Sequence, residues 1–183
     1  MKDAIERYDR AATAFTATVR GVDANAWEQP APCEGWVARD VVRHLVAWVP
    51  GMMLERRGLP VPEIPSVDDD PVGAWAAIDG ALRSGLSDPE VAAGTDDVGL
   101  GPKTFAEAVD MFCTPDVLVH TWDLARATGQ DESLDPDLVS SILEGMEPMD
   151  AALRGSGQFG PRVEVGPNAD KQTRLIAFTG RTP

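Results

Sequence analysis

The segment Val117-Leu-Val-His-Thr-Trp-Asp-Leu-Ala125 decides the fold class of this 183-residue chain. It is apolar on nearly every side of a helical wheel, so we expect a helix that its neighbours bury. Asp116, His120 and Asp123 nevertheless share one face of this helix, at positions i, i+4 and i+7. Buried carboxylates and imidazoles cost free energy unless they are hydrogen-bonded, paired with a charge or bound to a metal ion. The segment therefore predicts a helical core that contains a polar site.

Amphipathic patterns outward from this segment predict an all-α protein. An apolar stripe with steps of three and four marks a first helix (Ile5, Tyr8, Ala12, Phe15, Val19, Val22). A second helix is expected from about Val37 to Arg57, ended by Gly58, and a last long helix carries another stripe (Val139, Ile142, Met146, Met149, Leu153) with a kink at Pro148. Four long helices with long connections predict a four-helix bundle.

Capping signals locate the helix starts. Asp70-Pro71 and Asp135-Pro136 each have the form of an N-cap followed by proline at the first helical position. The first of them opens a shorter helix whose inner face is apolar (Trp75, Ile78, Leu82, Leu86). Thr104 and Glu107 have the spacing of a capping box, which starts the helix that carries His120.

That central helix is expected to run to Thr128 and to stop at Gly129. Pro115 lies inside it, so the helix either kinks there or restarts with Thr114 as its cap. The stretch from Ser87 to Lys103 is expected to be a loop. We expect residues 1–155 to form the metal-binding bundle and residues 156–183 to form an extension, a strap with one short helix, packed on the same domain.

Charge and composition exclude several classes of partner. The formal net charge is -14, and such an acidic surface repels phosphate backbones and anionic lipid, so neither nucleic acid nor a membrane is expected to bind. The N-terminal sequence MKDAIERYDR contains no apolar signal region, and we expect a cytoplasmic protein. In that compartment the two cysteines, Cys33 and Cys113, are expected to be reduced thiols of the core.

The two histidines of the chain are the strongest candidates for metal ligands. His44 lies between Val41 and Trp48 in the three-four pattern of the second helix, so we expect it to point inward. Two imidazoles and the carboxylate of Asp116 would form a three-ligand set with an open position, which suits zinc or nickel. The alternative is a core histidine, His120, hydrogen-bonded to a neighbouring carboxylate, with Trp36, Trp48 and Trp122 as filling of the core.

Two strings of residues resemble a known superfamily. They are Cys33-Glu-Gly-Trp-Val-Ala-Arg-Asp-Val-Val-Arg-His44 and Asp116-Val-Leu-Val-His120-Thr-Trp-Asp-Leu-Ala-Arg-Ala-Thr-Gly129, and the tail Arg174-Leu-Ile-Ala-Phe-Thr-Gly-Arg-Thr-Pro183 adds to the likeness. They are similar to the DinB-like helical superfamily, and within it to the metal-binding domain of mycothiol-dependent maleylpyruvate isomerases and their single-domain relatives. The resemblance implies a four-helix bundle whose metal ion is held by His44, Asp116 and His120.

This sequence departs from the isomerase pattern in two ways. The isomerases have glutamate where this chain has Asp116, so the shorter side chain is expected to bind the ion directly, to bind it through water, or to orient His120. The isomerases also carry an additional C-terminal domain that contributes to the thiol site, and no part of these 183 residues corresponds to it.

Two functions are therefore considered. The first is a metal-dependent enzyme of the low-molecular-weight-thiol transferase or isomerase type, which would take a thiol such as mycothiol and a small-molecule substrate. Asp123, Arg126 and Trp36 are then candidates for orienting a ligand or contacting substrate, with an ion pair between helices as the alternative role of Asp123 and Arg126. No residue is assigned to the chemical step. The second is a non-catalytic helical bundle that binds a metal ion or a small ligand. A homodimer is compatible with either function.

Overall fold

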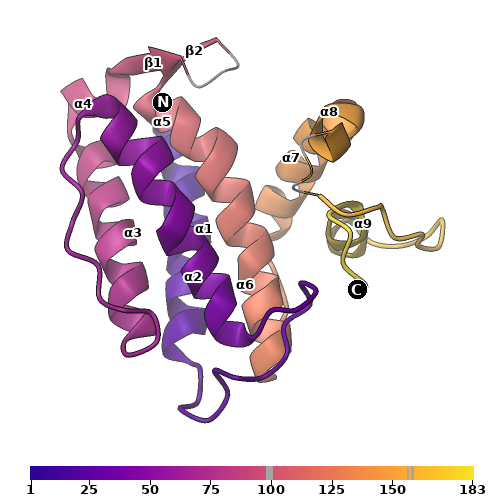
Figure 1. Cartoon of the computed structure of the whole chain (residues 1–183). Coiled ribbons are helices and arrows are strands. Elements are labelled where there is room, and N and C mark those ends of the chain that lie inside the picture. Colours follow the sequence, from indigo (N-terminus) through magenta and orange to yellow (C-terminus); the bar gives the residue numbers. More distant parts are fainter. Residues whose placement is uncertain (98–100, 156, 158) are drawn as a thin grey trace.

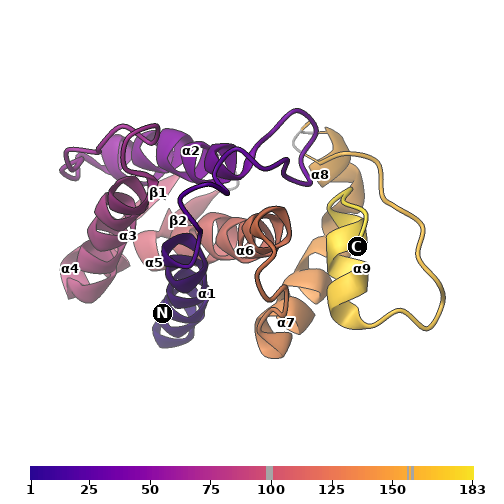
Figure 2. The ribbon, with the colours of Figure 1, turned by 90° about the horizontal axis from the view of Figure 1, so that it is seen from below.

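The computed structural model describes residues 1–97, 101–155, 157 and 159–183, and this part of the chain is mostly helical (Figure 1). Helices α1 and α2 each contact both α3 and α6, so the four lie side by side around a shared interior (Figures 1 and 2). Their bounds are Lys2–Arg20 for α1, Ala38–Val49 for α2, Pro71–Ser87 for α3 and Thr114–Thr128 for α6. None of the described helices has the length and apolarity that crossing a bilayer requires.

Most residues of the apolar stripes predicted from the sequence lie in the interior, but Met149 of the last stripe is exposed. Phe15 and Trp75 are buried and meet edge to face, with ring centroids 4.7 Å apart, which joins α1 to α3. The indole N–H of Trp75 donates to Thr16 Oγ1 at 2.8 Å, so the polar atom of this ring is satisfied. Each large side chain buried in this way stabilises the fold by about 1.5–3 kcal/mol. The packing places α2 against α6, and this is the contact on which the functional site forms.

The second helical run ends at Arg57 as predicted, but it is not a single α-helix. The α-helix gives way to a π turn over Pro50–Leu54 and then to a 3-10 turn over Glu55–Arg57. Proline lacks the amide hydrogen that an α-helix needs inside its ladder, and the wider turn starts at that residue. Gly58 then adopts φ +65 and ends the run.

The central helical run is also interrupted by a π turn. It starts with α5, Phe105–Ala108, and the predicted capping box is present, because Thr104 Oγ1 accepts from the Glu107 amide at 3.1 Å and Glu107 Oε2 accepts from the Thr104 amide at 2.9 Å. A π turn over Val109–Cys113 follows and leads directly into α6. Thr114 has helical backbone angles there, so it does not act as the cap of a restarted helix.

The predicted loop from Ser87 to Lys103 is wrong in part. Its described residues include a short helix, α4 (Pro89–Ala93), and a strand, β1 (Thr95–Asp97), which pairs antiparallel with β2 (Pro102–Thr104). These elements have three to five residues each, which is too short for an apolar period to be visible in the sequence. The all-α expectation therefore needs a small two-stranded sheet added to it.

The segment from α7 to the end of the described chain lies to one side of the four packed helices (Figures 1 and 2). It comprises α7 (Pro136–Met146), a 3-10 turn at Glu147–Met149 where Pro148 predicted a kink, α8 (Asp150–Gly155) and α9 (Lys171–Phe178). Helix α9 packs on α7, and the residues after it return to α6, where Thr182 accepts a hydrogen bond from Arg126 at 3.2 Å. The end of the described chain is thereby brought to the helix that carries His120.

Candidate metal centre

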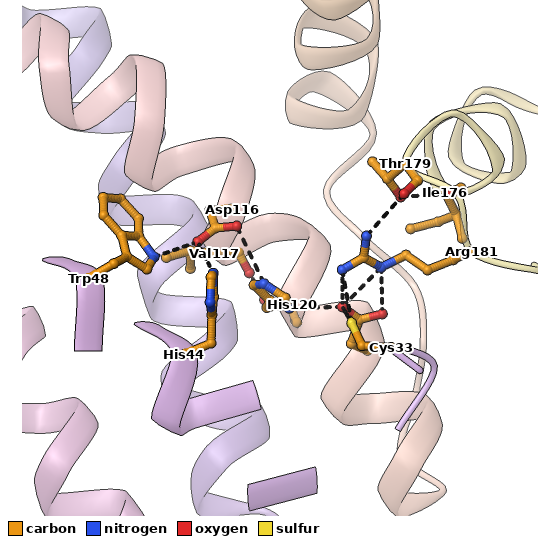
Figure 3. A network of polar contacts seen from close by, with 11 residues as sticks. Cys33, His44, Trp48, Asp116, Val117, His120, Ile176, Thr179 and Arg181 are labelled. Carbon is orange, nitrogen blue, oxygen red and sulfur yellow. Dashed lines mark hydrogen bonds and ion pairs between the residues drawn. The ribbon is translucent and has the colours of Figure 1, made fainter. Parts of the chain in front are cut away.

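Three candidate ligands meet between α2 and α6 (Figure 3). Asp116 lies between the two histidines, with Oδ2 3.2 Å from His44 Nε2 and Oδ1 3.4 Å from His120 Nε2. Asp116 and His120 are one helical turn apart on α6, while His44 comes from α2 across the interface. One ligand atom from each of the three residues lies within 4.8 Å of the others. The structure therefore brings together the set that the sequence singled out.

The carboxylate of Asp116 is held in its ionised form. Burial raises its pKa, but the charges and hydrogen bonds of His120 and His44 outweigh burial and hold the pKa well below the usual range of an aspartate. The indole N–H of Trp48 also donates to Asp116 Oδ2, at 2.9 Å. An anionic oxygen with fixed neighbours is a suitable ligand for a divalent cation.

The other nitrogen of His120 is bound to a second carboxylate. Nδ1 lies 2.8 Å from Asp123 Oδ2, on the next turn of α6. Burial alone would lower the pKa of His120, but Asp116 and Asp123 raise it to about 9, so without an ion the ring bridges two carboxylates. A histidine that donates from Nδ1 to a carboxylate keeps Nε2 directed at the opposite side, which is the arrangement typical of metal-binding histidines.

A guanidinium from the end of the described chain completes this network (Figure 3). Arg181 donates from Nε to Asp123 Oδ1 at 2.9 Å and from Nη2 to Asp123 Oδ2 at 2.7 Å. The same Nη2 lies 3.3 Å from Cys33 Sγ. Sequence reasoning missed Arg181, because nothing in a single sequence connects it to a residue 58 positions earlier. The only local signal was Gly180, which reverses the chain at φ +91 directly before it.

Cys33 lies at the edge of this network, not in the core as expected. It is half-buried, and its thiol is 3.7 Å from Asp123 Oδ2. Burial and the neighbouring Asp123 raise the pKa of the Cys33 thiol to about 12, although Arg181 opposes them, so the thiol stays protonated. Cys113, by contrast, is fully buried as predicted.

A second group of possible ligands, Cys33, His120 and Asp123, is equally compact but already has a cation in it. The guanidinium of Arg181 donates to both oxygens of Asp123 and to the sulfur of Cys33. A metal ion there would have to displace a buried charge partner. The recorded polar contacts of the Asp116 carboxylate within the described part of the chain are with the two histidines and Trp48. The donors that fit a divalent ion are therefore the two imidazole nitrogens and the Asp116 carboxylate.

The ring of Trp36 lies against both histidines of the centre. It stacks on the ring of His120, with centroids 5.8 Å apart and planes at 17°, and its centroid is 5.3 Å from that of His44. The side chain of His44 is 35% exposed, so the centre is partly accessible to solvent. A turn places the ring there: the Trp36 amide donates to the Cys33 carbonyl at 3.0 Å, and Gly35 takes the left-handed conformation, φ 76, that the turn requires.

Two other residues considered from the sequence are found outside the ligand group. Arg126 donates to Glu132 from Nε at 2.9 Å and from Nη2 at 2.7 Å, and its guanidinium lies 4.3 Å from the ring centroid of Trp122. Trp122 itself is buried in the core.

Comparisons with known proteins identify a family for the chain. The family described as the mycothiol maleylpyruvate isomerase N-terminal domain matches residues 8–58, a range that includes His44. Two uncharacterised proteins from two strains of Mycobacterium tuberculosis, CDC 1551 / Oshkosh and one other, are each 30% identical over 182 residues, which is 98% of this chain and 98% of the relative. No solved structure matches the chain significantly. With residues 8–58 matched by the family model and its relatives aligned over nearly their whole length, the chain belongs to the family of the mycothiol maleylpyruvate isomerase N-terminal domain.

Proposed function

We propose that this protein binds one divalent transition-metal ion, zinc or nickel, through His44, Asp116 and His120. The observation that carries the proposal is the convergence of three ligand atoms within 4.8 Å between two helices. The contact of Asp123 with His120 Nδ1 supports it, because it directs Nε2 toward the other two ligands. We further propose that the four packed helices form a bundle of the DinB type within residues 1–155, on which residues 156–183 are an extension of the same domain.

The proposed activity is that of a low-molecular-weight-thiol transferase or isomerase, with mycothiol as the candidate thiol. An ion held by these residues would lower the pKa of a thiol or water bound at its open position and so supply a nucleophile at neutral pH. The residues of the chain would perform the positioning. Trp48 and the two histidines fix Asp116, and Trp36 offers an aromatic wall beside the partly exposed His44, where a small-molecule substrate would enter.

A second candidate is a non-catalytic protein that binds a metal ion or a small ligand, and one observation favours it. Both carboxylates next to the histidines are already engaged, Asp116 by His44 and Trp48, and Asp123 by Arg181. Neither is free to accept a proton from substrate as a general base would. Activity would then depend on the bound ion alone, or be absent.

Metal content tests the proposed site first. Protein purified without chelator should contain about one zinc or nickel ion per chain, as expected for a three-ligand site. Inductively coupled plasma mass spectrometry measures this content. His44→Ala and His120→Ala should lose the ion. Asp116→Asn should weaken binding, while Asp110→Asn should not, because Asp110 has nearly the same exposure (27% against 29%) but pairs with Arg7. Wild-type protein that neither contains nor takes up zinc or nickel would contradict the site.

Turnover then separates the two functions. The metal-loaded protein would be assayed with mycothiol and a panel of small electrophiles, including a cis-trans isomerisable dicarboxylate. Product formation that disappears in His44→Ala supports the enzyme. Metal binding without turnover across the panel favours the non-catalytic protein.

A further inference from the structure

We propose that Arg181 is a positioning residue of this centre, which acts through Asp123 to hold the imidazole of His120 in the orientation that a metal ion needs. The inference rests on the proposed function, because the ion it serves is the one assigned to His44, Asp116 and His120. It assigns a role at the centre to a residue of the C-terminal segment, which contributes none of the three ligands.

The geometry forms an uninterrupted chain of contacts from Arg181 to the ligand group. The guanidinium donates two hydrogen bonds to Asp123, from Nε to Oδ1 at 2.9 Å and from Nη2 to Oδ2 at 2.7 Å. The same Oδ2 lies 2.8 Å from His120 Nδ1, and His120 Nε2 lies 3.4 Å from Asp116 Oδ1 on the opposite side of the ring. A planar, bidentate pair fixes the plane of the carboxylate, and the carboxylate in turn fixes the plane of the imidazole.

Burial makes this contact necessary and not incidental. The side chain of Asp123 is 0% exposed and that of Arg181 is 14% exposed, so water cannot replace the guanidinium easily. A buried carboxylate that loses its charge partner is strongly unfavourable. Of the side-chain contacts that the structure records for Asp123, those with His120 and Cys33 would remain without Arg181. The plane of the carboxylate would then no longer be fixed through both of its oxygens.

The backbone after α9 is shaped to deliver this side chain. Gly180 takes φ +91, and a methyl group in place of its hydrogen would lie 3.1 Å from Gly160 Cα, so the reversal depends on glycine at this position. The Arg181 amide then donates to the Ile176 carbonyl at 3.3 Å, and Nη1 donates to the Thr179 carbonyl at 3.3 Å. These bonds anchor both ends of the arginine to the end of α9 while its guanidinium reaches α6.

The test compares two arginines that each link α6 to the C-terminal segment, Arg181 through Asp123 and Arg126 through Thr182. Arg181→Met removes the hydrogen bonds to Asp123 but keeps a long, unbranched apolar side chain. Arg126→Met is the matched control, since Arg126 binds Glu132 and the Thr182 carbonyl but makes no recorded contact with Asp123. For each full-length variant, the zinc dissociation constant is measured by competition with a chromophoric chelator. The 15N shifts of the His120 ring nitrogens report the protonation and the hydrogen bonding of each nitrogen.

Arg181→Met should weaken zinc binding by about 10–100-fold, the usual effect of losing a group that orients a metal ligand. Arg181→Lys, which keeps the charge but cannot bind both oxygens in one plane, should recover part of the loss, and Arg126→Met should bind as the wild type does. Unchanged affinity and unchanged His120 shifts in folded Arg181→Met would overturn the proposal. If Arg181→Met does not fold, Arg181→Lys decides, because wild-type affinity in that variant would overturn it equally.

Failure of the proposed function is a different outcome from failure of this inference. If the wild-type protein binds no zinc or nickel, the metal site is wrong. The His120 15N shifts of the metal-free protein still test the positioning role: they should change in Arg181→Met and stay constant in Arg126→Met.

Discussion

The hydrogen bond from Trp48 to Asp116 can be tested by a double-mutant cycle in metal-free protein. The variants are Trp48→Phe, which removes the indole N–H, Asp116→Ala, which removes the acceptor, and the double variant. In the structure Nε1 lies 2.9 Å from Oδ2 of a carboxylate that is held ionised by its two histidines. Because each single change also alters packing, only the interaction energy of the cycle isolates the bond.

The expected interaction energy follows from the environment of the bond. A hydrogen bond to a charged group contributes about 1.5–3 kcal/mol. Asp116 is 29% exposed, so water replaces part of the lost contact, and we expect the lower end of that range, about 1.5 kcal/mol. The free energy of unfolding would be measured for all four proteins by urea denaturation in the presence of a chelator, with circular dichroism as the signal. Substitutions at independent sites add to within about 0.5 kcal/mol, so an interaction energy below that value would refute the reasoning.

Three further outcomes are expected from denaturation experiments. Burial raises the pKa of Tyr8 well above its ordinary 10.0, so ionisation costs more in the folded state, and stability should decline as pH rises above 10; Tyr8→Phe should reduce that decline. Thr104→Ala should lower the free energy of unfolding by about 1 kcal/mol through loss of the cap. Gly180→Ala should lower it by about 1–3 kcal/mol through backbone strain, whereas Gly166→Ala, with open space around it, should change it by less than about 0.5 kcal/mol.

Each of these expectations has a result that contradicts it. Parallel stability curves of Tyr8→Phe and wild type between pH 9 and pH 11 would show that Tyr8 does not govern the alkaline decline. A wild-type midpoint for Thr104→Ala would mean that the capping box contributes nothing to the start of α5. Equal effects of the two glycine substitutions on the free energy of unfolding would show that the positive φ of Gly180 does not strain an alanine at this position.

Periodicity and capping residues predicted the long helices well, because both are local properties of the chain. The N-caps at Asp70 and Asp135 and the stop at Gly129 are present where the sequence indicated them. The two π turns were not predicted, since a proline shows that an α-helix is disturbed but not which turn replaces it. The short elements between residues 87 and 104 were missed because three to five residues are too few for an apolar period to be visible.

The proposed ligands of the candidate site were predictable from the sequence, but the arginine that contacts Asp123 behind them was not. His44, Asp116 and His120 could be proposed because histidines and a carboxylate on apolar helix faces need partners, and that need is visible in the sequence. Arg181 could not be proposed, because its contact with Asp123 depends on how the segment after α9 returns to α6. Arg126, three residues after Asp123, was the arginine considered from the sequence, either for the site or for an ion pair, and the structure pairs it with Glu132.

The π turn at Val109–Cys113 also bears on how this chain tolerates changes in length. A π turn contains one residue more than an α-turn, which is equivalent to a single insertion in an otherwise regular helix. Deleting one residue there should restore regular α-helix and leave the flanking helical segments facing nearly the same neighbours, because a π turn uses one extra residue to cover about the same rotation. The capping box at Thr104 and the pair of Asp116 and His120 would then keep their relative positions. A one-residue deletion within regular α6, between Asp116 and His120, should instead change the angle between these two ligands on the helix by about 100°. The chain should thus tolerate the loss of one residue at the π turn and not within α6.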